Sequence, residues 1–233
     1  MRALLAKTAR TLRKVIVPGV LGLAIVLTIA HFSWKYSGSN EWQLVRDENG
    51  IQIFTLKAPG STLLKCKART RVRTSLSSSV FLFRGDESTY KDNGPDLKII
   101  ERIETPDVYV AYLAFTQKMP PPFKPTEMVV LLNYAQDKQT KTVEINVQAA
   151  PTRVPPTPGA TRVTHLNNLF RLTPLPNGEV QWEVDGEVDM GLFYPLQNLS
   201  MPGYLFKDFN RLRQLVLTEK YQKARLLSVR ELS

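Results

Sequence analysis

Hydrophobic and polar residues alternate along most of the chain beyond residue 41, and this period of two predicts β-strands. Asn49-Gly50, Asp137-Lys138 and residues 174–178 are turn signals between strands, and Thr105-Pro106-Asp107 is expected to form another hairpin turn. Turns this short make neighbouring strands antiparallel. The strands are expected at residues 51–56, 65–73, 97–104, 108–118, 128–136, 142–149, 162–173 and 179–189.

A helical period replaces this alternation in two places. The shorter helix is expected at residues 75–83, and the longer from about Pro202, which suits a first helical turn, to about Leu227. An apolar stripe on the longer helix contains Leu205, Phe209, Leu212, Val216 and Tyr221. A curved antiparallel sheet must cover its apolar face, and this helix is the available cover. We therefore expect an α+β helix-grip, in which the sheet wraps around the long C-terminal helix and encloses a cavity.

An uncharged apolar segment at residues 15–32 precedes the strands. As a helix its 18 residues span about 27 Å, close to the thickness of a bilayer core. Five basic residues before it and only Lys35 after it predict a cytoplasmic N-terminus and an exported remainder, periplasmic if the source is a bacterium. A cleaved signal peptide is the alternative, although residues 28–30 make a poor cleavage site. The expected organisation is a basic flank at 1–14, a transmembrane anchor at 15–34, a linker at 35–41 and one domain at 42–233.

The formal charge of +10 would fit a nucleic-acid partner only if the basic residues were gathered in the folded domain. Residues 1–40 hold six basic residues and no acidic one, which leaves 25 basic and 21 acidic residues in the remainder. More than half of the excess therefore lies beside the apolar segment, and no nucleic-acid partner is expected. One cysteine, Cys66, and two histidines argue against a disulfide framework and a metal site built from these residues.

Trp42-Gln43-Leu44 is followed, at residues 46–54, by a charged Asn-Gly-Ile turn that leads into a strand. This opening resembles the START family of lipid-binding domains, which begin with a tryptophan and an Asp/Asn-Gly-Ile turn. The second half of a START domain is similar to this chain at residues 150–163, 172–174 and 189–191, with Pro195 and Asn198. The resemblance extends from about Trp42 to about Leu217, and it implies a helix-grip with a cavity for a hydrophobic ligand, no cofactor and no catalysis.

One motif departs from the family pattern. A proline-rich stretch followed by Arg-Asp usually begins a central strand, whereas here residues 119–125 are followed by Thr126-Glu127. A ligand contact or a buried ion pair of that arginine is therefore not carried over. A second proline-rich segment, residues 151–159, either ends two strands or forms one wall of a cavity mouth.

Two stripes of opposite charge occupy alternate positions of two expected strands. The basic stripe comprises Lys65, Lys67, Arg69, Arg71 and Arg73, and the acidic stripe comprises Gln181, Glu183, Asp185, Glu187 and Asp189. In a START-like sheet these two strands are neighbours, so we expect a ladder of cross-strand ion pairs on the outer face. The alternative is a basic patch that binds anionic lipid headgroups or another acidic partner.

The ligand would contact the opposite faces of the strands and the long helix. Residues expected to line the cavity are Thr70, Tyr112, Ala114, Val130, Leu132, Tyr134, Ile145, Trp182 and Val184 of the sheet, with Leu205, Phe209 and Leu212 of the helix. Tyr112, Tyr134 and Trp182 could place polar atoms inside an apolar site. Each of these residues taken singly also fits ordinary core packing, so the cavity prediction rests on the fold.

No catalytic or metal site is expected. His165 lacks a recognisable nucleophile or carboxylate partner, and Glu101 and Glu104, three apart on a strand, face opposite sides. We expect a non-enzymatic, membrane-anchored domain that binds a lipid or other apolar molecule, with lipid transfer as one use of such binding. The alternatives are a protein-interaction module with a collapsed cavity and a cyclase- or hydrolase-type enzyme on the same fold.

Overall fold

The computed structural model describes residues 2–84, 96–105, 108–119 and 121–232, with side chains described from residue 16 onward. The chain divides into two compact units, and each is described by itself. The first comprises Met1–Glu41 and Lys57–Thr62, and the second comprises Trp42–Leu56 and Leu63–Ser233.

The first unit contains a long helix, α1 (Arg2–Tyr36). Its segment Ile16–Tyr36 is long and apolar enough to cross a membrane, and none of its apolar window is buried. A membrane anchor and a signal sequence both fit this finding. The side chains of the basic flank expected at residues 1–14 lie outside the described residues.

Residues 57–62 close the C-terminal end of α1. The Lys57 Nζ donates hydrogen bonds to the carbonyl oxygens of Lys35 and Ser37 at 3.3 and 3.1 Å. The Trp34 Nε1 donates to the carbonyl oxygen of Thr62 at 2.8 Å. The last carbonyls of a helix lack intrahelical partners and carry partial negative charge, so an ammonium group is a favourable cap.

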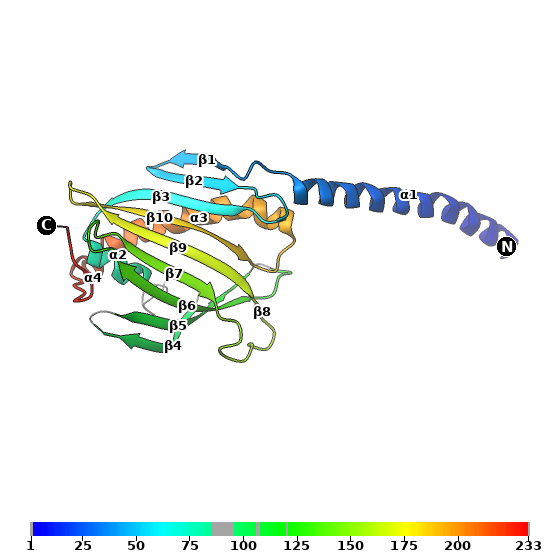
Figure 1. The fold of residues 1–233 in the computed structure, drawn as a ribbon. Coiled ribbons are helices and arrows are strands. Elements are labelled where there is room, and N and C mark those ends of the chain that lie inside the picture. Colours follow the sequence, from blue (N-terminus) through cyan, green and yellow to red (C-terminus); the bar gives the residue numbers. More distant parts are fainter. Residues whose placement is uncertain (1, 85–95, 106–107, 120, 233) are drawn as a thin grey trace. The chain divides into compact units, whose positions relative to one another are not determined.

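The second unit is built on one large curved sheet, shown in Figure 1. The ten strands assigned within the described residues are β1 (Trp42–Glu48), β2 (Ile51–Leu56), β3 (Lys65–Arg73), β4 (Asp96–Glu104), β5 (Tyr109–Gln117), β6 (Thr126–Gln136), β7 (Val143–Ala149), β8 (Thr161–Arg162), β9 (His165–Pro174) and β10 (Glu179–Asp189). Their order is β1-β2-β3-β10-β9-β7-β6-β5-β4, with antiparallel pairing throughout. The short β8 pairs with β6 in parallel.

The sequence pattern located these strands except for β1 and the separate β8. Asn49 and Gly50 both have positive φ, 54° and 72°, and form the two-residue turn between β1 and β2. The edge strand β1 is mostly exposed, so it lacks the apolar alternation that identified the others. The expected turn at Thr105-Pro106-Asp107 falls partly outside the described residues, although Thr105 N donates to the Val108 carbonyl at 2.8 Å.

The helices of this unit are α2 (Leu76–Phe83), α3 (Tyr194–Val216) and α4 (Glu219–Gln222). Ser75 begins α2 as predicted, because its hydroxyl accepts a hydrogen bond from the Ser78 N at 3.0 Å. The predicted start of the long helix at Pro202 is wrong. Pro195 occupies the first turn of α3, Pro202 lies inside the helix, and Tyr221 belongs to α4.

A tertiary contact explains the earlier start of α3. Gln197 is only 2% exposed, and its Nε2 donates to the Val188 carbonyl oxygen at 2.6 Å. Its Oε1 accepts a hydrogen bond from the Met190 N at 3.0 Å. The buried amide therefore fixes the first turn of α3 to the end of β10, and an apolar stripe does not reveal such a contact.

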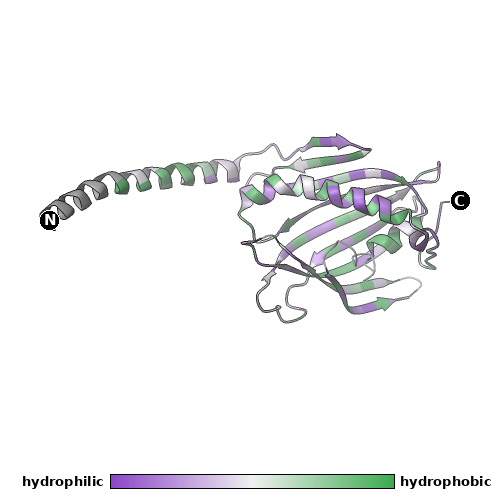
Figure 2. Cartoon of the chain, turned by 180° about the vertical axis from the view of Figure 1, so that it is seen from behind, coloured by the Kyte–Doolittle hydropathy of each residue, from purple (hydrophilic) through white to green (hydrophobic). Residues whose placement is uncertain are grey.

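The long helix α3 lies across the inner face of the sheet, as Figures 1 and 2 show from opposite sides. Phe206, Phe209, Leu212 and Val216 on α3 are buried against the sheet, while α2 covers a different part of the same face. Both helices and the inner sides of the strands form one hydrophobic core. The architecture is the expected α+β helix-grip, with the candidate membrane-spanning helix before it.

The charged ladder predicted on the outer face is confirmed for Lys65, Lys67 and Arg69. β3 and β10 are antiparallel neighbours, with Arg69 opposite Glu183. Glu183 accepts from Arg69 at 2.7 Å and lies 4.0 Å from the Lys67 ammonium, and Lys65 pairs with Glu187 at 3.6 Å. These pairs occupy much of the basic stripe, which leaves fewer cations for an anionic headgroup.

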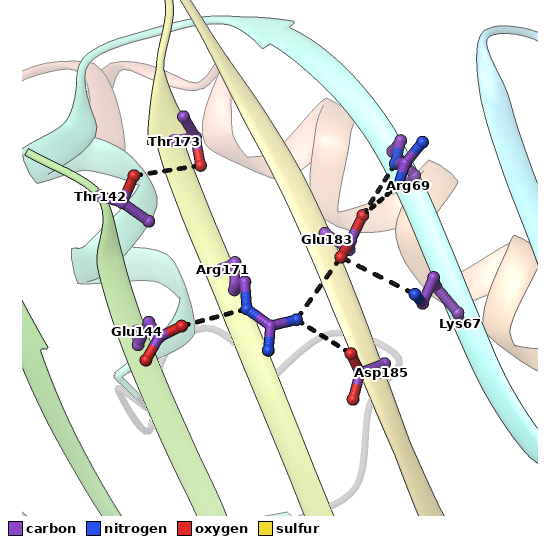
Figure 3. A network of polar contacts seen from close by, with 8 residues as sticks. All are labelled: Lys67, Arg69, Thr142, Glu144, Arg171, Thr173, Glu183 and Asp185. Atoms are coloured by element: carbon purple, nitrogen blue, oxygen red, sulfur yellow. Dashed lines mark hydrogen bonds and ion pairs between the residues drawn. The ribbon is translucent and has the colours of Figure 1, made fainter. Parts of the chain in front are cut away.

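Arg171 of β9 extends the ladder to two further strands, as Figure 3 shows. Its guanidinium contacts Glu183 and Asp185 of β10 at 3.5 and 2.9 Å, and Glu144 of β7 at 3.0 Å. Because alternate residues of a strand face opposite sides, this network lies on the side of the sheet away from α3. The inner face is therefore available for apolar packing.

Candidate ligand cavity

A cavity of about 380 Å³ lies between the sheet and the N-terminal half of α3. Its lining comes from β3, from the ends of β5, β6, β9 and β10, and from α3 with the loop before it. Apolar side chains dominate, among them Leu205 and Phe209 of the helix. A concave, mostly apolar site with a few polar groups is typical of small-molecule binding.

Methionine side chains are concentrated in the lining of this cavity. Four of the five methionines in the chain line it: Met119, Met128, Met190 and Met201. They come from four different parts of the chain, since they follow β5, begin β6, follow β10 and lie on α3. The unbranched, polarisable methionine side chain adapts to ligands of different shape. We call this site the methionine-lined cavity.

Gln117 and Tyr204 supply uncharged polar groups to the methionine-lined cavity. Both residues line it, Gln117 from the end of β5 and Tyr204 from α3, and the Gln117 side chain lies near the Tyr204 hydroxyl. Burial, together with the nearby Asp208 carboxylate, raises the pKa of Tyr204 to about 12, although 44% of the residue is exposed. The hydroxyl therefore stays protonated near neutral pH and can donate a hydrogen bond.

Both acidic residues of the cavity lining already have cationic partners. Asp208 pairs with Arg211 at 2.9 Å. Glu187 pairs with Lys65 at 3.6 Å and contacts the His165 ring at 3.0 Å. The negative charge of both carboxylates is therefore balanced by neighbouring cations.

The structure brings only some of the predicted residues to the cavity. Val184, Leu205 and Phe209 line it. Leu212 is buried one turn further along α3. Five others share the inner face of the sheet and are buried in the core without lining the cavity: Thr70, Val130, Leu132, Ile145 and Trp182.

Tyr112 and Ala114 were assigned to the wrong face of β5. Ala111 pairs with the buried Leu132 and Leu113 with the buried Val130, so these residues point inward and their neighbours point outward. The Tyr112 ring lies under the Arg153 guanidinium, 4.4 Å from its centroid. Residues 109–115 form a nearly continuous apolar run, from which the phase of a period-two pattern cannot be read.

The two remaining aromatic candidates have polar partners outside the cavity. The Trp182 Nε1 donates to the Ser79 hydroxyl of α2 at 2.9 Å. The Tyr134 hydroxyl is 2.7 Å from the Ser228 hydroxyl, and the Tyr134 ring stacks on Tyr109. Both side chains serve the packed part of the core.

Sequence reasoning missed the four methionines, Gln117 and Tyr204. Met119, Met128 and Met190 lie at or beside strand ends, where strand alternation carries little information, and Met201 lies within α3 outside the predicted apolar stripe. Their concentration could have been found only by placing the ends of β5, β6 and β10 beside α3. Tyr204 is one residue before the predicted stripe residue Leu205, so the apolar stripe did not indicate it, although it lines the cavity with Gln117.

A buried ion pair lies where the family motif was found to differ. Glu127 of β6 accepts hydrogen bonds from Arg162 Nε and Nη2 of β8 at 3.0 and 2.8 Å, and both side chains are less than 10% exposed. Arg162 also donates to carbonyl oxygens of Pro151, Val154 and Pro155. The proline-rich segment at 151–159 is thereby fixed to the sheet, and its residues do not line the cavity.

The residues considered for catalysis do not come together in one site. His165 is more than half exposed and contacts Glu187. Glu101 pairs with Arg153, and Glu104 pairs with Arg84 at 2.5 Å. Among the described residues, no group of three or more His, Cys, Asp or Glu side chains could hold a metal ion.

The only cysteine in the sequence, Cys66, lines the cavity. It is 8% exposed, and burial raises its pKa to about 11. The thiol therefore remains protonated near neutral pH, as expected for a packing residue.

Known structures share this architecture. A fragment of the STAR-related lipid transfer protein from Xanthomonas axonopodis is 17% identical, with a TM-score of 0.69 over 76% of this chain and 99% of that chain. Human STARD10 is 17% identical, with a TM-score of 0.63 over 81% and 78%. The lipid transfer and protein localization domain of human StarD13 is 13% identical, with a TM-score of 0.64 over 84% and 97%.

The fold is the START helix-grip. No protein-family model matches the sequence, and no curated protein matches it. At such low identities the likeness establishes the fold alone. Ligand and activity therefore have to be argued from the cavity of this chain.

Proposed function

We propose that this chain binds a lipid or other apolar molecule in the methionine-lined cavity. The observation that carries the proposal is an open, mostly apolar space of about 380 Å³ between α3 and the inner face of the sheet, beside the hydrophobic core of a START helix-grip. Burial of apolar ligand surface would supply the binding free energy, at about 25 cal/mol per Å² before ordering costs. The protein-interaction alternative requires a collapsed cavity, so this open space supports ligand binding instead.

We also propose that α1 anchors the chain in a membrane and that the START-like domain is exported. Ile16–Tyr36 has the length and hydropathy of a span, and the basic residues precede it. Only residues 37–41 separate this helix from β1, so the domain stays close to one leaflet. Uptake of a lipid from that leaflet, followed by its transfer or presentation, is the use that this arrangement favours.

The start of α3 offers an apolar surface beside the cavity. Phe193, Leu196 and Leu199 are exposed there, Leu199 to 81%. An exposed apolar cluster is favourable against a membrane and unfavourable in water. Movement of this part of α3 would open the cavity for ligand entry.

We propose a binding function without catalysis. The polar groups that line the cavity are amides, a phenol, a hydroxyl, a protonated thiol, one exposed lysine and carboxylates with cationic partners. Among the described lining residues, no hydrogen bond pairs the thiol or the hydroxyl with a base. A START-like protein of this kind would release the molecule that it took up, chemically unchanged.

Native mass spectrometry of the full-length chain released from nanodiscs tests the proposal. We expect one small apolar ligand per chain. Leu205→Trp, which fills the cavity from α3, should empty it, whereas Leu199→Trp on the exposed side of the same helix should not. An empty wild-type chain, or equal occupancy in both variants, would refute cavity binding.

A further inference from the structure

The volume of the methionine-lined cavity limits the ligand. One acyl chain extends about 15 Å, half of the apolar core of a bilayer. With carbon atoms in contact at ~3.5–4.0 Å, it fills a column of roughly 250 Å³. The cavity of about 380 Å³ therefore accommodates one chain. The two chains of a phospholipid need roughly 500 Å³ and do not fit.

Aromatic side chains prevent the cavity from extending along the sheet. Phe170 and Phe209 line it, and behind them lies Phe83 of α2. The centroid of the Phe83 ring is 5.1 Å from that of Phe170, 6.5 Å from that of Phe209 and 4.9 Å from that of Trp182. Trp182 is fully buried and hydrogen-bonded to Ser79, so this wall is fixed on its far side. A second chain could enter only by displacing packed rings.

The polar groups of the cavity favour an uncharged ligand. Asp208 and Glu187 have cationic partners, so they attract a ligand cation only weakly and offer an anionic ligand no favourable contact. Gln117 and the protonated Tyr204 hydroxyl offer donors and acceptors without net charge. Lys118, the basic residue of the lining, is exposed and therefore hydrated. Transfer of an ionised headgroup into this site would cost its hydration without a free counter-charge inside.

We infer that the cavity selects an amphiphile with one apolar chain, or a ring system of similar volume, and one uncharged hydrogen-bonding group held near Gln117 and Tyr204. Two-chain phospholipids and ionised single-chain lipids are excluded as preferred ligands. The methionines adapt to the shape of the apolar part, while the Phe83–Phe170–Phe209 wall sets its length. This inference rests on the proposed function and specifies the ligand class for the same site.

Photo-crosslinking with the full-length chain in nanodiscs tests the inference. Diazirine-tagged monooleoylglycerol, oleate and dioleoylphosphatidylcholine are supplied at the same low mole fraction, and labels on Met128, Met201 and Phe209 are measured by peptide mass spectrometry. Monooleoylglycerol should label these residues about tenfold more than either other probe. Equal or stronger labelling by the phosphatidylcholine would overturn the one-chain limit but support cavity binding. Equal labelling by oleate would overturn the requirement for an uncharged group, and absence of label from all three would refute both proposals.

A gain of binding provides a second test that a failure to fold cannot mimic. Phe170→Ala removes a ring of the wall and enlarges the cavity toward α2. We expect its labelling by the phosphatidylcholine probe to rise severalfold relative to monooleoylglycerol. Phe81→Ala, which changes a ring packed on Tyr221 away from the cavity, is the matched control and should leave the ratio unchanged. An unchanged ratio in Phe170→Ala would show that the wall does not set the ligand size.

Discussion

The inner face of the sheet has a filled region under α2 and an open region under the first half of α3. Seven of the eight α2 residues are buried, and Trp182 donates to Ser79 within this packing. The open region instead carries four methionines around a cavity of about 380 Å³. The difference teaches why a cavity persists: two helices fill the curvature of the sheet, whereas one helix alone does not. The proposed ligand site is thereby separated from the filled region under α2.

The largest effect should come from the filled region. Trp182→Ala should reduce the free energy of unfolding by about 4 kcal/mol, because it removes a fully buried indole and leaves a void. Met201→Ala, beside space that is already open, should cost about 1 kcal/mol or less. Pulse proteolysis in urea measures both. Equal costs would erase the distinction between the two regions.

Breaking the Glu127–Arg162 pair tests whether the proline-rich segment at 151–159 contributes to stability, like the filled region, or to ligand binding. Arg162→Met should cost about 3 kcal/mol, because it leaves a buried carboxylate without its cation. Ligand occupancy at saturation should be unchanged, since the segment does not line the cavity. Stability by pulse proteolysis and occupancy by native mass spectrometry would separate the two effects. A variant that is stable but empty would place this segment in the binding site.

Acid titration should report on the same pair with a smaller effect. Burial alone would raise the pKa of Glu127, but hydrogen bonds from Thr157 and Arg162 outweigh it and hold the pKa below its ordinary value. The stabilisation is therefore complete above the unfolded-state pKa of about 4.3 and is lost as the pH falls through the lower folded-state value. Glu127→Gln should flatten this part of the stability profile. A profile as steep as that of the wild type would assign the acid loss to other carboxylates.

The smallest effect is expected on the outer face. Glu183→Gln weakens the contacts of one carboxylate with Lys67, Arg69 and Arg171, which are in part exposed. The cost should be about 1 kcal/mol and should shrink in high salt, because exposed pairs are weak and screened. Unfolding at low and high ionic strength measures it. A cost that salt does not change would mean that packing, not charge, is lost.

Strand positions and the ladder could be predicted because alternation and charge are local patterns. Asn49-Gly50 predicted the turn, and the two charged stripes, taken with the START-like strand order, predicted the pairing of β3 with β10. The face of β5 could not be predicted, since apolar residues occupy both its sides. The start of α3 depends on the buried amide of Gln197, a contact that joins residues of different elements.

The cavity was predictable as a consequence of the fold, but most of its lining was not. Val184, Leu205 and Phe209 were found because they lie on regular apolar faces that point inward. Three of the methionines lie at or beside strand ends and Met201 lies within α3, and only the tertiary arrangement brings them together. Trp182 has the right orientation for a cavity residue, yet α2 covers it. The pattern of a single strand does not show which part of the inner face is covered by a packed helix.

The most direct measurement compares the two regions in one experiment. Monooleoylglycerol is titrated into the full-length chain in nanodiscs with ¹³C-methyl methionine and ¹⁵N labels, and the methionine methyl and Trp182 indole NMR signals are followed. Signals of Met119, Met128, Met190 and Met201 should shift together and saturate at one ligand per chain, while the Trp182 indole signal stays in place. Unmoved methionine signals, or a Trp182 shift as large as theirs, would contradict a ligand site confined to the open region.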